Sequence, residues 1–344
     1  MRARLAVEGD AARWNGFVDR EPSACLYHRW EWGDVFARVY ARSPVRLLCE
    51  DDDGAVAGVL PLVSMWNPIS GRALVSMPYF GHAGVASSSP DAARALVAEA
   101  ATYAQRHLYA SVELRQWHDV APPSVPSRDD KVLMILDLPS TEDALSKALG
   151  SKLRSQINRP RKEGMTTRVG GVELVSDFHA VYAENMRDLG SPCHARALFA
   201  RALEAFHPHG FVVTVEHEGH TVAAGIVFGH RDTLEIPCAS SLRSANKLSP
   251  NMLLYWEILR TAVNRGYRRF DFGRSSRDAG TYKFKAQWGA KERPLRYLYL
   301  LRTGVEPPRI SAANPRLAKI AERWSTLPLG VTNRLGPVLA SLLP

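Results

Sequence analysis

The chain has 344 residues, 46% of them hydrophobic and 23% charged, with a formal net charge of +9. This composition excludes a disordered chain, and the longest apolar run, residues 55–66, is interrupted by Pro61 and is too short to cross a bilayer. The length suits about two domains of ~150 residues, so an ordinary globular enzyme is the expected class.

The first residues lack the apolar core of a signal peptide, and we expect a cytoplasmic protein. The four cysteines are scattered without a Cys-x-x-Cys pair, which predicts reduced thiols and no metal site. Residues 1–150 hold 15 basic and 19 acidic side chains, a net of −4, whereas residues 151–304 hold 24 and 14, a net of +10. The basic half favours polyanionic partners; a generally Arg-rich surface is the alternative.

Taken in chain order, the elements occur twice. The first half predicts hairpin strands at 45–50 and 55–63, a helix at 91–107 and a strand at 109–114. The second half predicts the same order at 211–216, 221–228, 250–265 and 267–272. Tyr109 precedes Glu113 by four residues, as Tyr267 precedes Asp271. The repeat indicates two similar α/β units, with chance similarity of two hairpins as the alternative.

Domain limits follow from prolines and from a closing strand. Residues 121–130 contain Pro122, Pro123 and Pro126, which mark a linker, and residues 131–138 form the last strand of the first unit. We therefore expect domains at 1–138 and 139–305, followed by an amphipathic tail at 306–344.

A helix opens the second unit. Ser140 is its expected N-cap, an apolar stripe runs from Leu145 to Ile157, and Pro160 ends or kinks it. Its other faces are strongly basic and suit phosphate binding; a solvated helix face is the alternative. The candidate phosphate ligands are Arg154, Arg159 and Lys162.

A second candidate anion site precedes the helix at 250–265. Ser249 is an N-cap with Pro250 at the first helical position, so the backbone amides near Asn251 face outward and can bind an anion. The preceding strand carries Glu235.

The most unusual stretch begins at Asp271. Gly273 and Arg274 follow the strand, and residues 282–290 then combine aromatic side chains with Lys283 and Lys285. Glycines allow close backbone approach, and aromatic rings can wall a binding slot. The alternative is a closing helix that packs through its aromatic residues.

These motifs, in this order, resemble a known family. The sequences at 247–251, 266–273 and 282–289 resemble the second half of FemAB-type transferases. The sequence at 185–192 resembles the FemAB-like proteins of exosortase/PEP-CTERM exopolysaccharide systems. The resemblance covers about residues 140–305 well and the first half more loosely.

The resemblance implies a tandem GNAT-like α/β fold and an acyltransferase. Its expected reaction moves an acyl or aminoacyl group onto an amine of a cell-envelope precursor of peptidoglycan or exopolysaccharide type. The donor is acyl-CoA or aminoacyl-tRNA, used as a cosubstrate without a tightly bound cofactor. The Gly-rich pyrophosphate turn of GNAT enzymes is missing at 244–248, which weakens acyl-CoA; the coiled-coil arm of some Fem proteins is missing too, which excludes tRNA docking by that arm.

The resemblance also assigns roles. The pair Phe284–Lys285 implies that Lys285 lies near the reacting carbonyl, where its charge would stabilise the oxyanion. Glu235 and Asp271 are the candidate bases. The other expected substrate-binding residues are Ser249, Asn251, Arg274, Tyr282 and Lys283 from the second unit, and Tyr79 and His82 from the first.

A rival hypothesis is a noncatalytic scaffold of an exopolysaccharide assembly system, held at the inner membrane surface. It rests on the tail, where Leu317, Ile320 and Trp324 share a helical face and basic residues lie nearby. Such a tail docks on an anionic bilayer or packs back on the first unit.

Overall fold

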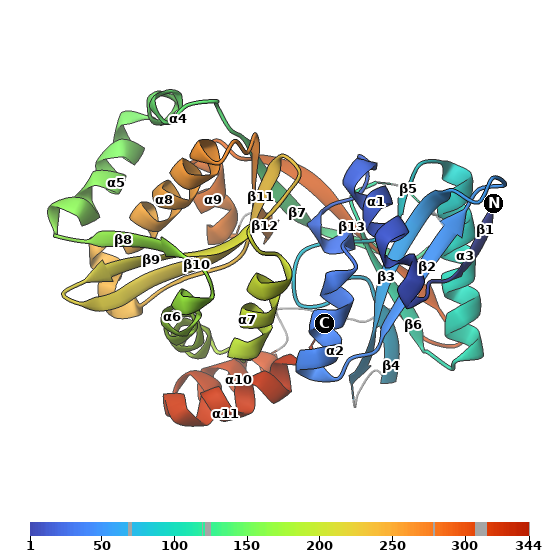
Figure 1. Cartoon of the computed structure of the whole chain (residues 1–344). Helices are drawn as coiled ribbons and strands as arrows, with labels where there is room; N and C mark the ends of the chain where they lie inside the picture. The colour runs from blue at the N-terminus through green and yellow to red at the C-terminus, as the bar shows by residue number, and fades with distance from the viewer. Residues whose placement is uncertain (68–70, 119, 121–124, 278, 307–314, 344) are drawn as a thin grey trace. The chain divides into compact units, whose positions relative to one another are not determined.

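The computed structural model describes residues 1–344 except 68–70, 119, 121–124, 278, 307–314 and 344. The chain forms two compact units (Figure 1). The first unit comprises Met1–Val132, Arg293–Ile310 and Leu342–Pro344, and the second comprises Leu133–Glu292 and Ser311–Ser341.

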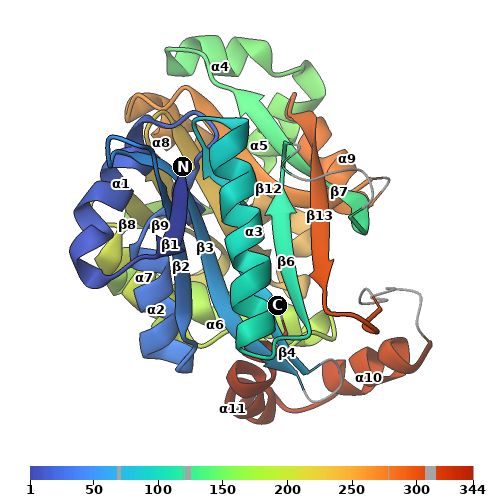
Figure 2. The same ribbon diagram turned by 90° about the vertical axis from the view of Figure 1, so that its right-hand side faces the viewer.

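The first unit is built on a mixed sheet. Its strand order is β1 (Arg2–Leu5), β2 (Pro44–Glu50), β3 (Val56–Asn67), β4 (Gly71–Val75), β6 (Ser111–Gln116) and β13 (Lys291–Leu301), with β5 (Ala86–Ser87) also paired to β3. β4 and β6 are parallel, and the other pairs are antiparallel. Helix α3 (Pro90–Arg106) covers one face (Figure 2), and α1 (Ala11–Arg20) and α2 (Glu31–Tyr40) cover the other.

Strand periodicity explains why this sheet has two cores. Neighbouring residues of a strand point to opposite faces, so Leu47 packs with Leu96 of α3, whereas Leu48 packs with Trp14 of α1. β13, which the sequence assigned to the second domain, pairs with β6 of the first unit from Leu301↔Ser111 to Arg296↔Gln116. This pairing satisfies the backbone of β6 on that edge.

The second unit contains the remaining strands. Its strand order is β8 (Thr166–Gly170), β9 (Gly210–His217), β10 (His220–His230), β11 (Thr233–Ser241) and β12 (Arg269–Ser276), followed by β7 (Ser127–Asp137), which enters from the first unit. β11 and β12 are parallel, whereas β8 to β11 pair antiparallel. Helices α4 (Glu142–Ala148), α5 (Ser151–Lys162) and α8 (Pro250–Asn264) lie on one side, and α6 (Val175–Asp188) and α7 (Arg196–Ala205) on the other (Figure 1).

The tail forms two helices, α10 (Pro315–Ser325) and α11 (Leu329–Ala340), that contact α6. Trp324 donates its indole N–H to the Ser191 carbonyl at 3.0 Å, and Cys193 lies buried beside Gly336. The expectation that the tail packs on the first unit is therefore corrected for Ser311–Ser341, which belong to the second. The side chain of Leu317 lies outside the described residues.

The predicted repeat is present in three dimensions. Each unit has an antiparallel hairpin, a helix and a strand parallel to an earlier one. In the first unit Val75 lies beside Glu113, and in the second Glu235 lies beside Asp271. The two acidic residues that the sequence aligned therefore hold the same register position, and the predicted α/β class is confirmed.

The helix predicted from Ser140 is wrong in detail, because it is two helices. Its N-cap is Thr141, whose hydroxyl accepts the N–H of Ala144 at 3.2 Å. α4 ends before Leu149, and Arg154 of α5 donates to the Leu149 carbonyl at 2.6 Å, which caps the break. Pro160 lies inside α5, which continues to Lys162. In the predicted linker, residues 127–130 belong to β7, and residues 121–124 lie outside the described residues.

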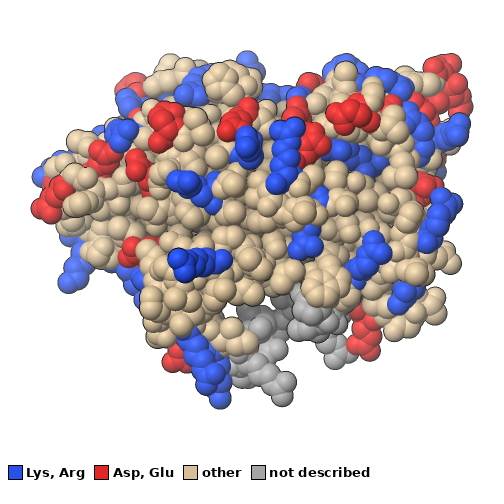
Figure 3. Space-filling view, turned by 60° about the horizontal axis from the view of Figure 1, so that its bottom comes forward, with Lys and Arg blue, Asp and Glu red and all other residues tan. Residues whose placement is uncertain are grey.

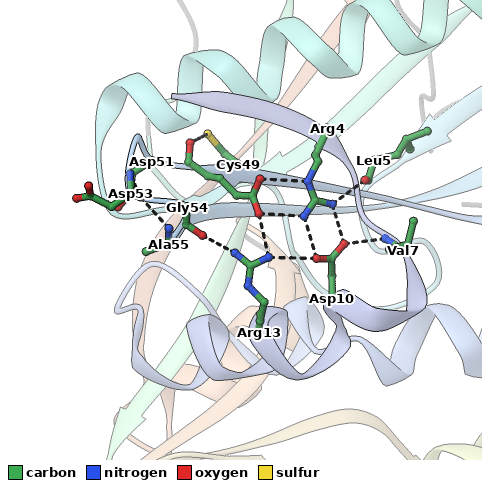
Figure 4. Close-up of polar contacts among 11 residues, drawn as sticks. Arg4, Leu5, Val7, Asp10, Arg13, Cys49, Asp51, Asp53, Gly54 and Ala55 are labelled. Atoms are coloured by element: carbon green, nitrogen blue, oxygen red, sulfur yellow. Dashed lines mark hydrogen bonds and ion pairs between the residues drawn. The ribbon is translucent and has the colours of Figure 1, made fainter.

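An ion-pair network links β1 to the start of α1 and to the end of β2 (Figure 4). Arg4 donates to both oxygens of Asp10, at 2.7 and 2.9 Å, and to Glu50 at 3.0 Å. Arg13 donates to Glu50 at 2.9 Å. The hydrogen bonds from Arg4 hold the pKa of Asp10 down at about 2, although burial opposes that shift. The network therefore stabilises the folded state where Asp10 is ionised.

Candidate active site

Parallel pairing of β11 and β12 puts two carboxyl groups side by side. Their register ends at Glu235↔Asp271, and both side chains are buried, with exposed fractions of 4% and 3%. β11 continues to Ser241 along β10 alone, with a bulge where Ile226 pairs with Cys238 and Phe228 with Glu235. Pro237 lies in that bulge and has no N–H for the ladder. The end of the parallel pairing therefore coincides with the two acids.

Lys285 comes to this point from helix α9 (Gly280–Ala286). Its side chain is 8% exposed, and its ammonium donates to the carbonyls of Gly273 at 3.1 Å and Arg274 at 2.9 Å. Burial lowers the pKa of Lys285 to about 8, although the charges of Asp271 and Glu235 raise it. An ammonium has three N–H donors, so one remains for a ligand.

Asp271 shapes the backbone that holds the lysine. Its Oδ1 accepts the N–H of Gly273 at 2.7 Å, and Gly273 has φ +72°, the left-handed region that favours glycine. In this conformation the successive carbonyls of Gly273 and Arg274 both reach the ammonium of Lys285. Asp271 is thus connected to Lys285 through the backbone as well as through charge.

Aromatic side chains adjoin α9. Tyr255 of α8 lies 5.5 Å from the Phe272 ring, 4.9 Å from the Phe284 ring and 6.2 Å from the Trp288 ring. Burial raises the pKa of Tyr255, which keeps it neutral. Apolar walls exclude water and strengthen electrostatic interactions at a buried charge.

The start of α8 has the features expected of an anion site, with one difference. Ser249 is the N-cap residue, but its backbone is left-handed (φ +58°) and its side chain makes no capping hydrogen bond. The first turn, which contains Asn251, has no acidic residue. Residues 243–248, where GNAT enzymes have a Gly-rich turn, form a 3-10 helix, with Lys247 exposed in its last turn.

The other predicted ligands of the second unit lie around this core. Arg274 is half-buried and close enough to Lys285 and Cys238 to affect their pKa values; burial raises that of Cys238 to about 12. Tyr282 donates its hydroxyl hydrogen to the carboxylate of Glu292 at 3.1 Å. Lys283 is exposed, because positions two apart on a helix face different sides.

The basic residues of α5 lie on a helix that packs on α8. Arg159 and Lys162 are exposed, whereas Arg154 directs its guanidinium to carbonyls at the end of α4. A phosphate-binding role for all three stays a prediction.

Tyr79 and His82 belong to the first unit. Tyr79 is 9% exposed, lies 5.3 Å from the Phe36 ring and has φ +74°, and burial raises its pKa to about 12. His82 is 2% exposed and lies 4.5 Å from the Trp117 ring. Both residues are part of an aromatic cluster of that unit, and their acceptor-binding role stays a prediction.

Sequence reasoning missed three contributors. The carbonyls of Gly273 and Arg274 bind the lysine, and Tyr255 joins the aromatic wall. A glycine two residues after a buried acid was visible in the sequence, but its φ was not. Pro237, inside a predicted strand, was the available signal that the strand pairing ends there.

Within the described residues, no group of three or more His, Cys, Asp or Glu side chains is placed to hold a metal ion. No helix among those same residues is long and apolar enough to span a membrane.

A family model matches the part of the chain that carries the candidate site. The family model described as an acetyltransferase (GNAT) domain matches residues 151–286, which include Glu235, Asp271 and Lys285. No curated protein sequence matches the chain.

Solved structures share the fold over most of this chain. FemX has a TM-score of 0.68 and 14% identity, over 87% of this chain and 97% of that one. L-PGS from Bacillus licheniformis gives 0.57 and 14%, over 92% and 97%. A tandem GNAT protein from the clavulanic acid biosynthesis pathway gives 0.53 and 13%, over 89% and 99%. At these identities the likeness establishes the fold, and the predicted tandem GNAT-like architecture is confirmed.

Proposed function

We propose that the protein, an acyltransferase with a GNAT domain in its second unit, transfers an acyl or aminoacyl group to an amine of a cell-envelope or exopolysaccharide precursor. The observation that carries the catalytic part is the ammonium of Lys285, which is buried at the end of the β11–β12 pair and has one N–H to spare. The acceptor class rests on the sequence resemblance to FemAB-like proteins and on the fold shared with FemX.

The chemistry needs an oxyanion partner and a proton acceptor. A neutral amine attacks the carbonyl carbon of the activated donor, and negative charge develops on the carbonyl oxygen. Lys285 donates its free N–H to that oxygen. The intermediate then collapses, the donor's oxygen or sulfur leaves, and the amine gives up a proton.

Glu235 is our proposed proton acceptor, and Asp271 is proposed as a positioning residue. The two carboxyl groups share one register position, but Asp271 already accepts the Gly273 N–H that shapes the lysine's carbonyl cradle. Glu235 lies on the neighbouring strand, beside the point where the parallel pairing ends. A proton can therefore move to Glu235 without disturbing the backbone that holds Lys285.

The donor is proposed to approach the N-terminus of α8. GNAT domains generally use acyl-CoA, and the acid-free first turn suits a pyrophosphate, but the 3-10 helix at residues 243–248 offers fewer free amides than a Gly-rich turn. The donor site thus fits an anion without selecting acyl-CoA over aminoacyl-tRNA. Thermal stabilisation by CoA thioesters or by charged tRNA, measured side by side, identifies the donor.

Lys285→Met tests the mechanism. We expect kcat to fall by about 10²–10³-fold, the cost of losing one oxyanion donor. Lys291→Met is the matched control, because it removes the same side chain from an exposed position at the start of β13, outside the predicted site residues, and should keep most activity. Equal activities of the two variants, with both folded by circular dichroism, would contradict the role of Lys285. Absence of transfer by the wild type with any donor would point to the scaffold hypothesis instead.

A further inference from the structure

In α11, the last helix that the structure describes, small residues face inward and large aliphatic residues face outward, which is the reverse of an ordinary surface helix. The face of α11 that packs inward carries small residues at i, i+4 and i+8, namely Thr332, Gly336 and Ala340, all buried. Gly336 fits directly against Cys193, where a Cβ would lie 2.8 Å from the sulfur. The close approach of α11 to the rest of the second unit therefore uses its small residues.

The large aliphatic residues of α11 face outward instead. Val331, Leu335, Val338 and Leu339 have exposed fractions of 40%, 49%, 63% and 41%. Their spacing of i, i+4, i+7 and i+8 puts them on one side of the helix. Ile320 of α10 adds another exposed aliphatic side chain, at 61%. We call these five residues the tail stripe.

Basic residues accompany the tail stripe on the same two helices. Residues 318–343 contain Lys319, Arg323 and Arg334 against Glu322 alone, and α11 itself has no acidic residue. Among the described residues, none of these three cations forms an ion pair. Figure 3 looks onto the side on which Figure 1 draws α10 and α11; basic side chains stand there among broad areas without charged residues.

The stripe is too small for a stable protein interface. A 12-residue helix is about 18 Å long, and a face about 10 Å wide offers roughly 200 Å², whereas a specific interface buries about 800 Å² on each partner. A bilayer interface has no such threshold, because an apolar helix face can lie in the headgroup region while flanking cations meet anionic lipids.

We propose that the tail stripe docks the protein on an anionic lipid bilayer, with α11 lying in the plane of the interface. The aliphatic side chains enter the boundary between headgroups and acyl chains, and Lys319, Arg323 and Arg334 contact lipid phosphates. No described helix is able to span, so the attachment is peripheral and reversible. The inference is independent of the acyl-transfer mechanism proposed above.

Vesicle sedimentation of the full chain tests the proposal. With phosphatidylcholine vesicles containing phosphatidylglycerol, the wild type should pellet, and added salt or removal of the anionic lipid should weaken binding. A Leu335→Glu/Val338→Glu variant should lose binding by about tenfold or more, because it puts two charges into the apolar boundary. Leu108→Glu is the control, since Leu108 is 70% exposed on the first unit and should bind like the wild type.

Three results would overturn the proposal. The first is a wild type that stays in the supernatant, and the second is equal pelleting of the stripe variant and the wild type. The third is a concentration-dependent dimer, seen by light scattering, that the stripe variant abolishes, which would assign the stripe to a second copy. Acyl transfer measured with soluble substrates tests the catalytic proposal separately. If the stripe variant fails to fold, the double variant Lys319→Glu/Arg334→Glu tests docking instead, and it too should bind the vesicles more weakly than the wild type.

Discussion

The two units pair the acidic residue at the same register position with different cations. In the first unit, Glu113 pairs with Arg115 at 2.8 Å, both are buried, and Arg115 also donates to the Met77 carbonyl at 3.0 Å. In the second unit, the residue two positions after Asp271 is Gly273, so the strand supplies no cation, and Lys285 arrives from α9.

The comparison teaches what distinguishes a structural acid from a candidate catalytic one. An arginine remains protonated at any ordinary pH and uses a rigid fork of donors, so the cation beside Glu113 does not titrate. A buried lysine titrates, and one with a free N–H can respond to a substrate. Val75 replaces Glu235 in the first unit, which removes the second carboxyl group as well.

Breaking the first unit's pair should have the largest effect. Arg115→Met leaves Glu113 buried without its cation, and we expect a loss of about 3–5 kcal/mol in the free energy of unfolding. Urea unfolding followed by tryptophan fluorescence measures it, and the double variant Glu113→Gln/Arg115→Met should recover part of the loss. If a folded Glu113→Gln variant binds its substrates normally but has a strongly reduced kcat, then Glu113 takes part in catalysis. That result would contradict its assignment as a structural acid.

The pH profile sharpens the contrast between the two cations. Because the pKa of Lys285 is about 8, its charge is present below that pH and is lost above it. We expect kcat/KM to fall about tenfold for each pH unit above 8, once the acceptor amine's own titration is corrected for. Lys285→Arg, assayed beside the wild type, should lack this fall. A rise in kcat/KM through pH 8 would instead make the neutral lysine a base.

Gly273→Ala probes the position in β12 at which the second unit has a left-handed glycine where the first unit has Arg115. The new Cβ meets only the Ile236 carbonyl oxygen, at 3.5 Å, so the cost comes from φ +72° and should be about 1–2 kcal/mol. Relaxation of that strain moves the carbonyls that hold Lys285, and we expect about a tenfold lower kcat. Gly266→Ala is the matched control, with φ +82° and open space around the Cβ. Equal kcat values would show that the carbonyl cradle is not needed.

We expect the smallest effect from the ion-pair network at β1, which contains a carboxylate whose charge serves stability alone. Asp10 has a lowered pKa of about 2, so its contribution to stability is complete above pH about 4 and is lost as the pH falls towards 2. Asp10→Asn should cost about 1–2 kcal/mol at pH 7, after allowance for the partly exposed Arg4, and much less near pH 2. Unfolding midpoints at both pH values measure this; a cost independent of pH would assign it to packing.

Much of the fold could be read from local pattern. The hairpins, α3, α8 and the strands after them follow from periodicity and turn residues, and the repeat aligned Glu113 with Asp271. The break between α4 and α5 could not be read in this way, because Arg154 caps it from the next helix. Neither could the assignment of β13 to the first unit, because strand pairing joins residues far apart in the chain.

The sequence by itself determined the hairpins, α3, α8 and the strands after them, the two-unit repeat and the candidacy of Lys285, because periodicity and motif order are local properties of a chain. Only the tertiary structure decided what Lys285 touches. Its pKa of about 8 arises because burial lowers it while carboxyl groups on two strands raise it, and these groups come together only when β11, β12 and α9 are packed. The outward face of α11 was decided in the same way, since small residues at its inner face set the packing and left the aliphatic ones outside.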